Sequence, residues 1–180
     1  SQAEFEALQR LRDAGVVVVA SAGNDGVDTS VTPVYPGSHL IENVVAVGSS
    51  SRSDIVPLSS NYGVGTVDLV APGVAIRTLG MTAETPLTTV SGTSFAAAHV
   101  SGALAILRAQ YPSDTATESI HRLLSGTDRK SGIYTLVHTG GRLNLAKSLA
   151  SAPRPFHDDF VNGALLVGDY VSVRTSTVGA

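Results

Sequence analysis

Residues 91–102, Ser-Gly-Thr-Ser-Phe-Ala-Ala-Ala-His-Val-Ser-Gly, place a serine between a glycine turn and a helix built of small residues. Ser94 then falls in the first helical turn, where backbone N–H groups have no intrahelical partner. The positive end of a helix stabilises negative charge, which a nucleophile needs as it attacks. The segment therefore predicts a helix over about 94–110, stopped by Pro112, with Ser94 as a candidate nucleophile.

A second segment, residues 16–26, carries a candidate hydrogen-bond donor. The apolar run Val16 to Ala20 is typical of a parallel strand that is covered on both faces. It runs into Ser21-Ala22-Gly23-Asn24-Asp25-Gly26, a glycine turn that presents the carboxamide of Asn24. Taken one at a time, Ser94 could be a plain helix cap and Asn24 a plain turn residue.

Together the two segments resemble the subtilisin-like serine peptidases. That family carries a G-T-S-x-A-x-P-H-V-x-G signature, matched by Gly92 to Gly102, and an A-x-A-G-N signature, matched by Ala20 to Asn24. Further matching landmarks, in the family's order, are Tyr35-Pro36-Gly37, Val44 to Gly48, Val70-Ala71-Pro72-Gly73 and Gly141-Arg142-Leu143-Asn144. The family's proline is replaced by Ala98, which favours a straighter helix without touching the nucleophile.

The resemblance implies an α/β fold: a subtilase-like parallel sheet with helices on both faces, incomplete at the N-terminus. Residues 1–150 would form the C-terminal portion of the peptidase domain. The resemblance makes Ser94 the nucleophile and gives the oxyanion two donors, the Ser94 N–H and the Asn24 side chain. Ser21, Ala22, Gly23 and Thr93 would line the substrate site, and Tyr35-Pro36 matches a position where the family has a cis peptide.

Two members of the family's catalytic triad are missing from this sequence. The aspartate turn D-[ST]-G and the histidine motif H-G-T do not occur, and no histidine precedes Asn24. We therefore expect the base and its orienting aspartate in an N-terminal half of the domain that lies upstream, and this chain alone to lack triad chemistry. The resemblance implies a parent serine endopeptidase that cleaves polypeptides through an acyl-enzyme. A non-catalytic subtilase-like binding module and an inactive fragment remain alternatives.

The amino-acid composition excludes several kinds of binding and catalysis. The net charge of −3, without a basic cluster, gives no support for binding to nucleic acid or to an anionic membrane. Without cysteine, thiolate metal sites and cysteine catalysis are excluded, whereas secretion is not. We expect a secreted protein whose chemistry needs no cofactor or metal. The resemblance does suggest a weak calcium site near Asp68.

Other patterns predict the rest of the domain. An amphipathic helix is expected over about 2–14, and strands over 44–48, 67–71, 76–79 and 87–90. A helix over about 115–125, capped by Ser113 or Asp114, precedes a hairpin-like stretch around 133–137 and a short helix over 144–150. His99 points away from Ser94 on its helix, so we expect it to be a buried structural residue.

The C-terminal residues differ in character from the domain. Ala152-Pro153-Arg154-Pro155 predicts a linker over 151–157. Residues 158–180 show alternating apolar positions that resemble the start of a β-rich accessory segment, cut short. It contains too few strands to fold alone.

Overall fold

The computed structural model describes residues 1–80 and 86–153. Its elements are α1 (Gln2–Asp13), β1 (Val18–Ser21), β2 (Val44–Ser50), β3 (Leu69–Pro72), β4 (Ile76–Leu79), β5 (Leu87–Val90), α2 (Thr93–Gln110), α3 (Ala116–Ser125), β6 (Asp128–Arg129), β7 (Gly141–Arg142) and α4 (Leu145–Ala150). The predicted strands 76–79 and 87–90 have the bounds expected. The long helix begins one residue earlier than predicted, at Thr93.

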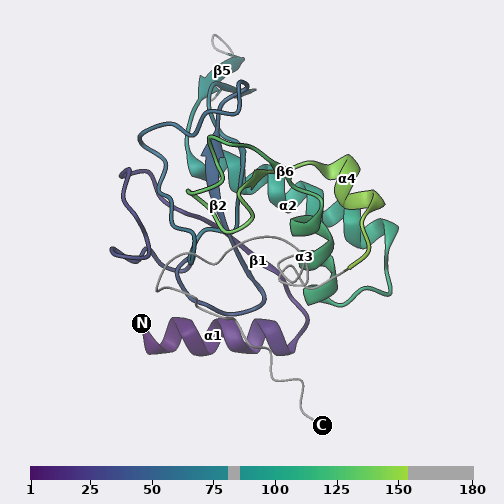
Figure 1. Ribbon diagram of the computed structural model, residues 1–180. Coiled ribbons are helices and arrows are strands. Elements are labelled where there is room, and N and C mark those ends of the chain that lie inside the picture. Colours follow the sequence, from purple (N-terminus) through teal and green to yellow (C-terminus); the bar gives the residue numbers. More distant parts are fainter. Residues whose placement is uncertain (81–85, 154–180) are drawn as a thin grey trace.

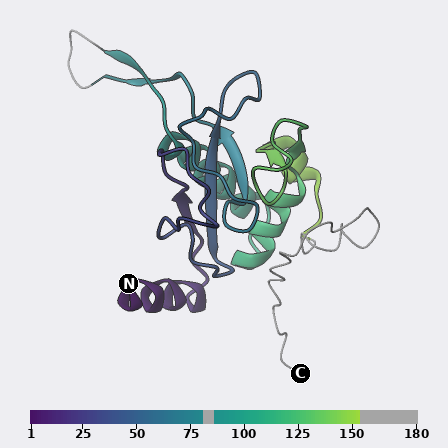
Figure 2. The ribbon, with the colours of Figure 1, turned by 60° about the vertical axis from the view of Figure 1, so that its left-hand side comes forward.

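A five-stranded sheet in the order β1-β2-β3-β7-β6 forms the centre of the described chain (Figure 1). β1, β2, β3 and β7 run parallel, while the short β6 pairs antiparallel with β7. β4 and β5 form a separate antiparallel ribbon that projects from the body of the molecule (Figure 2). Because β1 to β3 are parallel, their carboxyl ends lie at one edge of the sheet, where ligands of open α/β sheets usually bind.

Helix α2 covers one face of the sheet, with α3 and α4 beside it (Figure 1). Small residues on its inner side, Ala96 and Ala103, let the helix backbone approach strands whose inward side chains are Val45, Val47 and Leu69. Val45, Val47 and Leu69 are fully buried, which is the condition under which apolar side chains contribute most to stability.

Helix α1 packs against the opposite face. Leu8 belongs to a small buried cluster with Ala20 of β1, Val44 of β2 and Ile41 of the loop before β2. The helix lies across the bottom of the view in Figure 1, beneath the strands. The expected α/β class, a largely parallel sheet with helices on both faces, is therefore confirmed.

Four local expectations were wrong. β1 begins at Val18 and is only partly buried, because it lies at the end of the sheet among the described strands. Helix α3 is capped by Thr115 in a reciprocal capping box with Glu118, while the Asp114 carboxylate is held by Arg122 at 2.9 Å.

The stretch around 133–137 is not a hairpin but a set of turns. Its apolar residues Ile133 and Val137 are buried against Val67 and Val70, so packing rather than strand pairing explains the pattern. His99 is exposed, and its Nδ1 lies 2.8 Å from the carbonyl oxygen of Phe95. Gly102 and Ile106, on the same side of α2 as His99, are also exposed in the described chain.

The predicted accessory segment 158–180 and most of the predicted linker lie outside the described residues. Among residues 1–80 and 86–153, no helix is both long and apolar enough to cross a membrane.

Candidate active site

The carboxyl end of β1 leads directly into the turn that carries Asn24. Ser21 ends the strand, and the Ala22 N–H donates to the carbonyl of Val47 on the neighbouring strand. Gly23 follows with φ +103°, a conformation that strains any residue with a side chain. The chain therefore turns sharply at Gly23 and brings Asn24 to the carboxyl edge of the sheet.

Helix α2 begins at the same edge. The Gly92 N–H donates to the carbonyl of Gly73, just beyond β3, at 2.8 Å. A Cβ on Gly73 would lie 2.8 Å from the Gly92 oxygen and 2.6 Å from Cβ of Ser49, so only glycine fits this contact. This close approach places the N-terminus of α2 beside the turn at Asn24.

Asn24 and Thr93, separated by 69 residues, are joined by two hydrogen bonds. The Thr93 backbone N–H donates to Asn24 Oδ1 at 2.9 Å, and the Thr93 hydroxyl donates to the same oxygen at 3.2 Å. A backbone N–H can only donate, so the atom that faces it must be the carboxamide oxygen. The Nδ2 group of Asn24 is then the end of the side chain left to bind a ligand.

Ser94, the next residue, is exposed and occupies the first turn of α2. The hydrogen bonds of the described residues include none from its backbone N–H or its hydroxyl. Gly92, at the N-cap, offers no side-chain cap to these first N–H groups. Ser94 therefore directly follows Thr93, the residue whose N–H and hydroxyl bind the Asn24 carboxamide, in the first turn of α2.

The residues expected to line the substrate site differ in exposure. Ser21 and Gly23 are partly buried, and Ala22 is 2% exposed. Thr93 is fully buried, and its hydroxyl also accepts the Gly23 N–H at 3.2 Å. The structure therefore directs the Thr93 side chain to the turn that carries Asn24.

The Tyr35-Pro36 peptide bond is cis, as the resemblance implied. Val34, just before it, is near the site: its side chain would be 3.5 Å from a Cβ on Gly23. The loop over 33–38 therefore lies against the Asn24 turn.

No hydrogen bond or ion pair in the described part of the chain joins Ser94 to a histidine. His99, on the same helix, is bonded to the Phe95 carbonyl one turn before it. The arrangement can therefore present a nucleophile and two oxyanion donors, but its described residues do not supply the base.

Asp68 does not suit the calcium site that the resemblance suggested. Asp68 is 2% exposed, and its Oδ2 accepts the Ala46 N–H at 2.8 Å, which ties β2 to the residue just before β3. Residues 1–80 and 86–153 hold no group of three acidic or histidine side chains placed to bind a metal ion. The Asp68 carboxylate thus has a hydrogen-bond donor in the backbone of β2.

Asn61 is a residue near the site that no sequence pattern had indicated. Its carboxamide is fully buried and hydrogen-bonds to both sides of the Asn24 turn. A single asparagine within Ser60-Asn61-Tyr62-Gly63 has the composition of an ordinary turn, so no spacing signal marks it.

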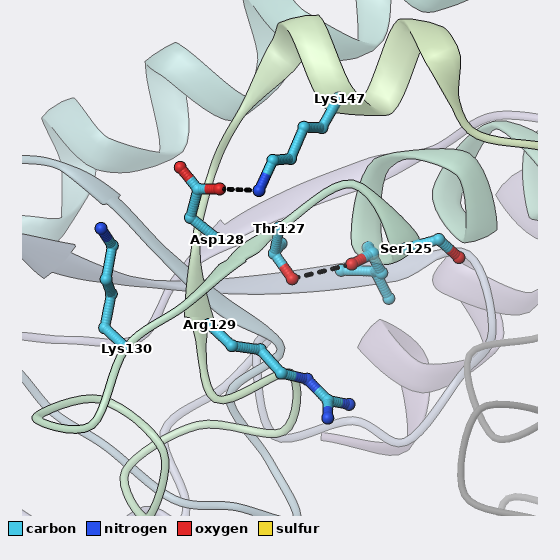
Figure 3. Close-up of a pocket in the computed structure, with 7 residues that line it drawn as sticks. Ser125, Thr127, Asp128, Arg129, Lys130 and Lys147 are labelled. Carbon is cyan, nitrogen blue, oxygen red and sulfur yellow. Dashed lines mark hydrogen bonds and ion pairs between the residues drawn. The ribbon is translucent and has the colours of Figure 1, made fainter. Parts of the chain in front are cut away.

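A hollow of about 520 Å³ lies elsewhere, between β6, the end of α3 and α4 (Figure 3). Asp128 lies beside it and is paired with Lys147 at 2.5 Å and with Arg142 at 3.0 Å. The hydrogen bond from Lys147, helped by those from Asn144 and Arg142, lowers the pKa of Asp128 from 3.8 to about 2. The hollow contains none of the expected site residues, and its Asp128–Lys147 pair joins α4 to β6.

The chain belongs to the subtilase family, whose model matches residues 1–144. An extracellular serine proteinase from Thermus sp. (strain Rt41A) is 36% identical over 118 residues, 66% of this chain and 28% of that protein. A thermophilic serine proteinase from Bacillus sp. (strain AK1) is 45% identical over 96 residues, 53% of this chain and 22% of that protein. Subtilisin DY from Bacillus licheniformis is 32% identical over 126 residues, 69% of this chain and 44% of that protein.

Solved structures share the fold. The A subunit of the AB5 toxin from E. coli matches with a TM-score of 0.68 and 29% identity, over 81% of this chain and 54% of that one. The prenylagaramide maturation protease PagA matches with a TM-score of 0.66 and 25% identity, over 81% of this chain and 53% of that one. The chain thus spans less than half the length of the three curated relatives named above.

Proposed function

We propose that this chain carries the nucleophile and the oxyanion donors of a serine endopeptidase that cleaves polypeptides through an acyl-enzyme. The contact between Thr93 and Asn24 Oδ1 is the observation that carries the proposal. It fixes the carboxamide with Oδ1 toward Thr93 and leaves Nδ2 to bind a ligand, next to Ser94 in the first turn of α2. Membership of a family whose relatives are named as serine proteinases supports the same activity.

In the proposed reaction the Ser94 hydroxyl attacks the carbonyl carbon of the scissile peptide bond. Its proton passes to a histidine base supplied by the rest of the domain, and the carbonyl oxygen becomes an anion. The Ser94 N–H and Asn24 Nδ2 donate to that anion. Collapse of the tetrahedral species breaks the C–N bond, the histidine protonates the leaving amine, and water later hydrolyses the acyl-enzyme by the same steps.

The partner of this chain in the proposal is an N-terminal half of its own domain. The outer side of α2 has small and apolar residues that the described chain leaves exposed: Ala98, Gly102, Ala105, Ile106 and Ala109. β1 pairs with β2 alone among the described strands, so one of its edges is open. An upstream half that adds a strand to β1 and covers α2 would bury both surfaces and bring the histidine and aspartate to Ser94.

We further propose that the parent protein is secreted. The relative from Thermus sp. is named as extracellular, and the sequence has no cysteine that oxidation outside the cell would affect.

Labelling with a fluorophosphonate, which phosphonylates activated serines with loss of fluoride, tests the proposal in the longer protein that contains this chain. We expect one label at Ser94, and loss of both label and peptide hydrolysis in Ser94→Ala. Ser101→Ala, which removes a hydroxyl bonded to the Ala97 carbonyl two turns along the same helix, is the matched control and should keep both. A folded parent whose Ser94 stays unlabelled would favour a non-catalytic binding module instead.

A further inference from the structure

The buried side chain of Asn61 lies beneath the turn that carries Asn24, and its carboxamide is hydrogen-bonded to the backbone of that turn. Asn61 is 0% exposed. Its Nδ2 donates to the Ala22 carbonyl at 2.9 Å, and its Oδ1 accepts the Asp25 N–H at 2.9 Å and the Val27 N–H at 3.1 Å. The Asn61 backbone N–H also donates to the Gly23 carbonyl at 3.0 Å. Residues before and after Asn24 are thus bonded to the same side chain.

Shape as well as hydrogen bonding ties Asn61 to the turn. A Cβ placed on Gly23 would lie 2.4 Å from Asn61 Nδ2, so the carboxamide occupies the space that a side chain there would need. Gly23 also has φ +103°, which favours glycine. The residue before Asn24 therefore lets the Asn61 side chain reach beneath the turn.

Asn24 is consequently held at two separate points. Thr93 fixes the oxygen of its side chain, while Asn61 fixes the backbone that bears it. An oxyanion donor contributes to rate only if it is already aimed where charge develops, because reorganisation during the reaction would cost part of the gain. Neither contact alone sets both the position and the direction of Nδ2.

We propose that Asn61 is a positioning residue for catalysis: it fixes the turn at residues 22–27 so that the Asn24 carboxamide faces the developing anion. The inference rests on the proposed peptidase function. Asn61 itself is buried and acts through Asn24, so it touches no reacting atom.

The test is a double-mutant cycle in the longer protein. Asn61→Leu keeps the volume but leaves two N–H groups and one carbonyl of the turn without their partner. We expect kcat to fall about 10- to 100-fold with KM little changed, because a small displacement of a catalytic group is that costly. In an Asn24→Leu background the same change should lower kcat by no more than about twofold, since the donor that Asn61 positions is already gone.

Asn43→Leu is the matched control. Asn43 is 1% exposed, and its carboxamide also bridges backbone, donating to the carbonyls of Leu8 and Val16 at the far end of the sheet. It should lower the melting temperature as Asn61→Leu does but leave kcat at a permissive temperature unchanged. If Asn61→Leu does not fold, Asn61→Asp replaces it: aspartate keeps the acceptor for Asp25 and Val27, loses the donor to Ala22 and adds a carboxylate beneath the turn.

Hydrogen exchange at the Asp25 and Val27 amides tests the positioning role of Asn61 independently of peptidase activity, because both amides donate to Asn61 Oδ1. Faster exchange at both amides in Asn61→Leu, with the cycle behaving as described, supports it. If the parent hydrolyses peptides but Asn61→Leu lowers kcat equally with and without Asn24, or changes KM alone, the positioning role is wrong while the peptidase stands. If the longer protein does not hydrolyse peptides, the proposed peptidase function is wrong. If the Asp25 and Val27 amides exchange at the same rate in Asn61→Leu as in the parent, Asn61 does not hold the turn in place.

Discussion

Asn24 shows how a single side chain is given a direction. Its oxygen accepts two hydrogen bonds from Thr93, and among the described residues its nitrogen makes none. A carboxamide rotated by half a turn would set Nδ2 against the Thr93 N–H, two donors facing each other, so the helix start selects one orientation. The direction of the donor thus follows from the backbone of α2.

Asn24→Asp separates the two ends of this carboxamide. The aspartate keeps an oxygen for Thr93, so the fold should survive, but it removes the N–H donor and puts a negative charge beside the developing anion. In subtilisin, loss of such a donor lowers kcat about 10²–10³-fold, and we expect at least this loss here. Steady-state kinetics of the longer protein measure the change in kcat, and a thermal melt verifies that the variant is folded. Hydrolysis as fast as the parent's would contradict the donor role.

At the scale of elements, two junctions between helices and strands matter, and only the first of them sets the site. The first is the contact between Gly73 after β3 and Gly92 before α2, which brings the helix start to the edge of the sheet. The second lies at the other end of the domain, where α4 is bonded to β6. Asp128 on β6 accepts hydrogen bonds from Arg142, Asn144 and Lys147, which come from β7, the cap of α4 and α4 itself.

The second junction should make stability depend on acidity. The pKa of Asp128 is about 2 in the folded protein, lowered from 3.8 chiefly by its hydrogen bond to Lys147. A carboxylate with a depressed folded pKa contributes stability that is present above about pH 4 and is lost as the pH falls toward 2. Asp128→Asn should therefore be less stable than the parent at pH 5, and the difference should shrink by pH 2.

Denaturant unfolding at several pH values between 2 and 5 measures this difference. Asp13→Asn, which removes a carboxylate whose side chain is 66% exposed, is the control and should follow the parent across the range. A stability difference for Asp128→Asn that stays constant with pH would show that the ion pairs around Asp128 contribute little.

At the scale of the whole molecule, the exposed side of α2 is the notable surface. A long helix that packs against a sheet normally presents charged residues to water, but Gly102, Ala105 and Ile106 on this side are small or apolar. Together with the open edge of β1, this side of α2 is the surface on which we propose that the N-terminal half of the domain packs.

Gly102→Ala tests that arrangement by the sign of its effect. A Cβ on Gly102 would meet nothing within 4 Å in this chain, so alanine should stabilise residues 1–180 by about 0.5–1 kcal/mol through helix propensity. In the longer protein, a covered helix would be overpacked, and the same change should destabilise by about 1–3 kcal/mol. Denaturant unfolding of residues 1–180 and of the longer protein, each with and without Gly102→Ala, measures the two changes in stability.

Gly132→Ala is the matched control, because a Cβ there also meets nothing within 4 Å and the position is far from α2 in sequence. Gly132→Ala should change the free energy of unfolding of residues 1–180 and of the longer protein by the same amount. If Gly102→Ala stabilises the longer protein as well, α2 is not covered on that side.

Sequence motifs alone identified the fold class and the two segments that meet at the site. Glycine turns, apolar runs and the serine helix are local patterns. The bounds of β4 and β5 were confirmed, and α2 begins within one residue of its predicted start. Patterns failed where a contact outside the local pattern decided the outcome. Asp114 binds Arg122 and Thr115 caps α3, while Ile133 and Val137 pack against Val67 and Val70 without forming strands.

Tertiary structure alone decided how Asn24 is aimed and what holds it. The Thr93 N–H and the Asn61 carboxamide lie 69 and 37 residues away in the chain, and neither carries a local signal of its role. Turn and helix propensities act within a few residues, whereas the hydrogen bonds of a buried carboxamide depend on which backbone groups the packed sheet and helix bring beside it.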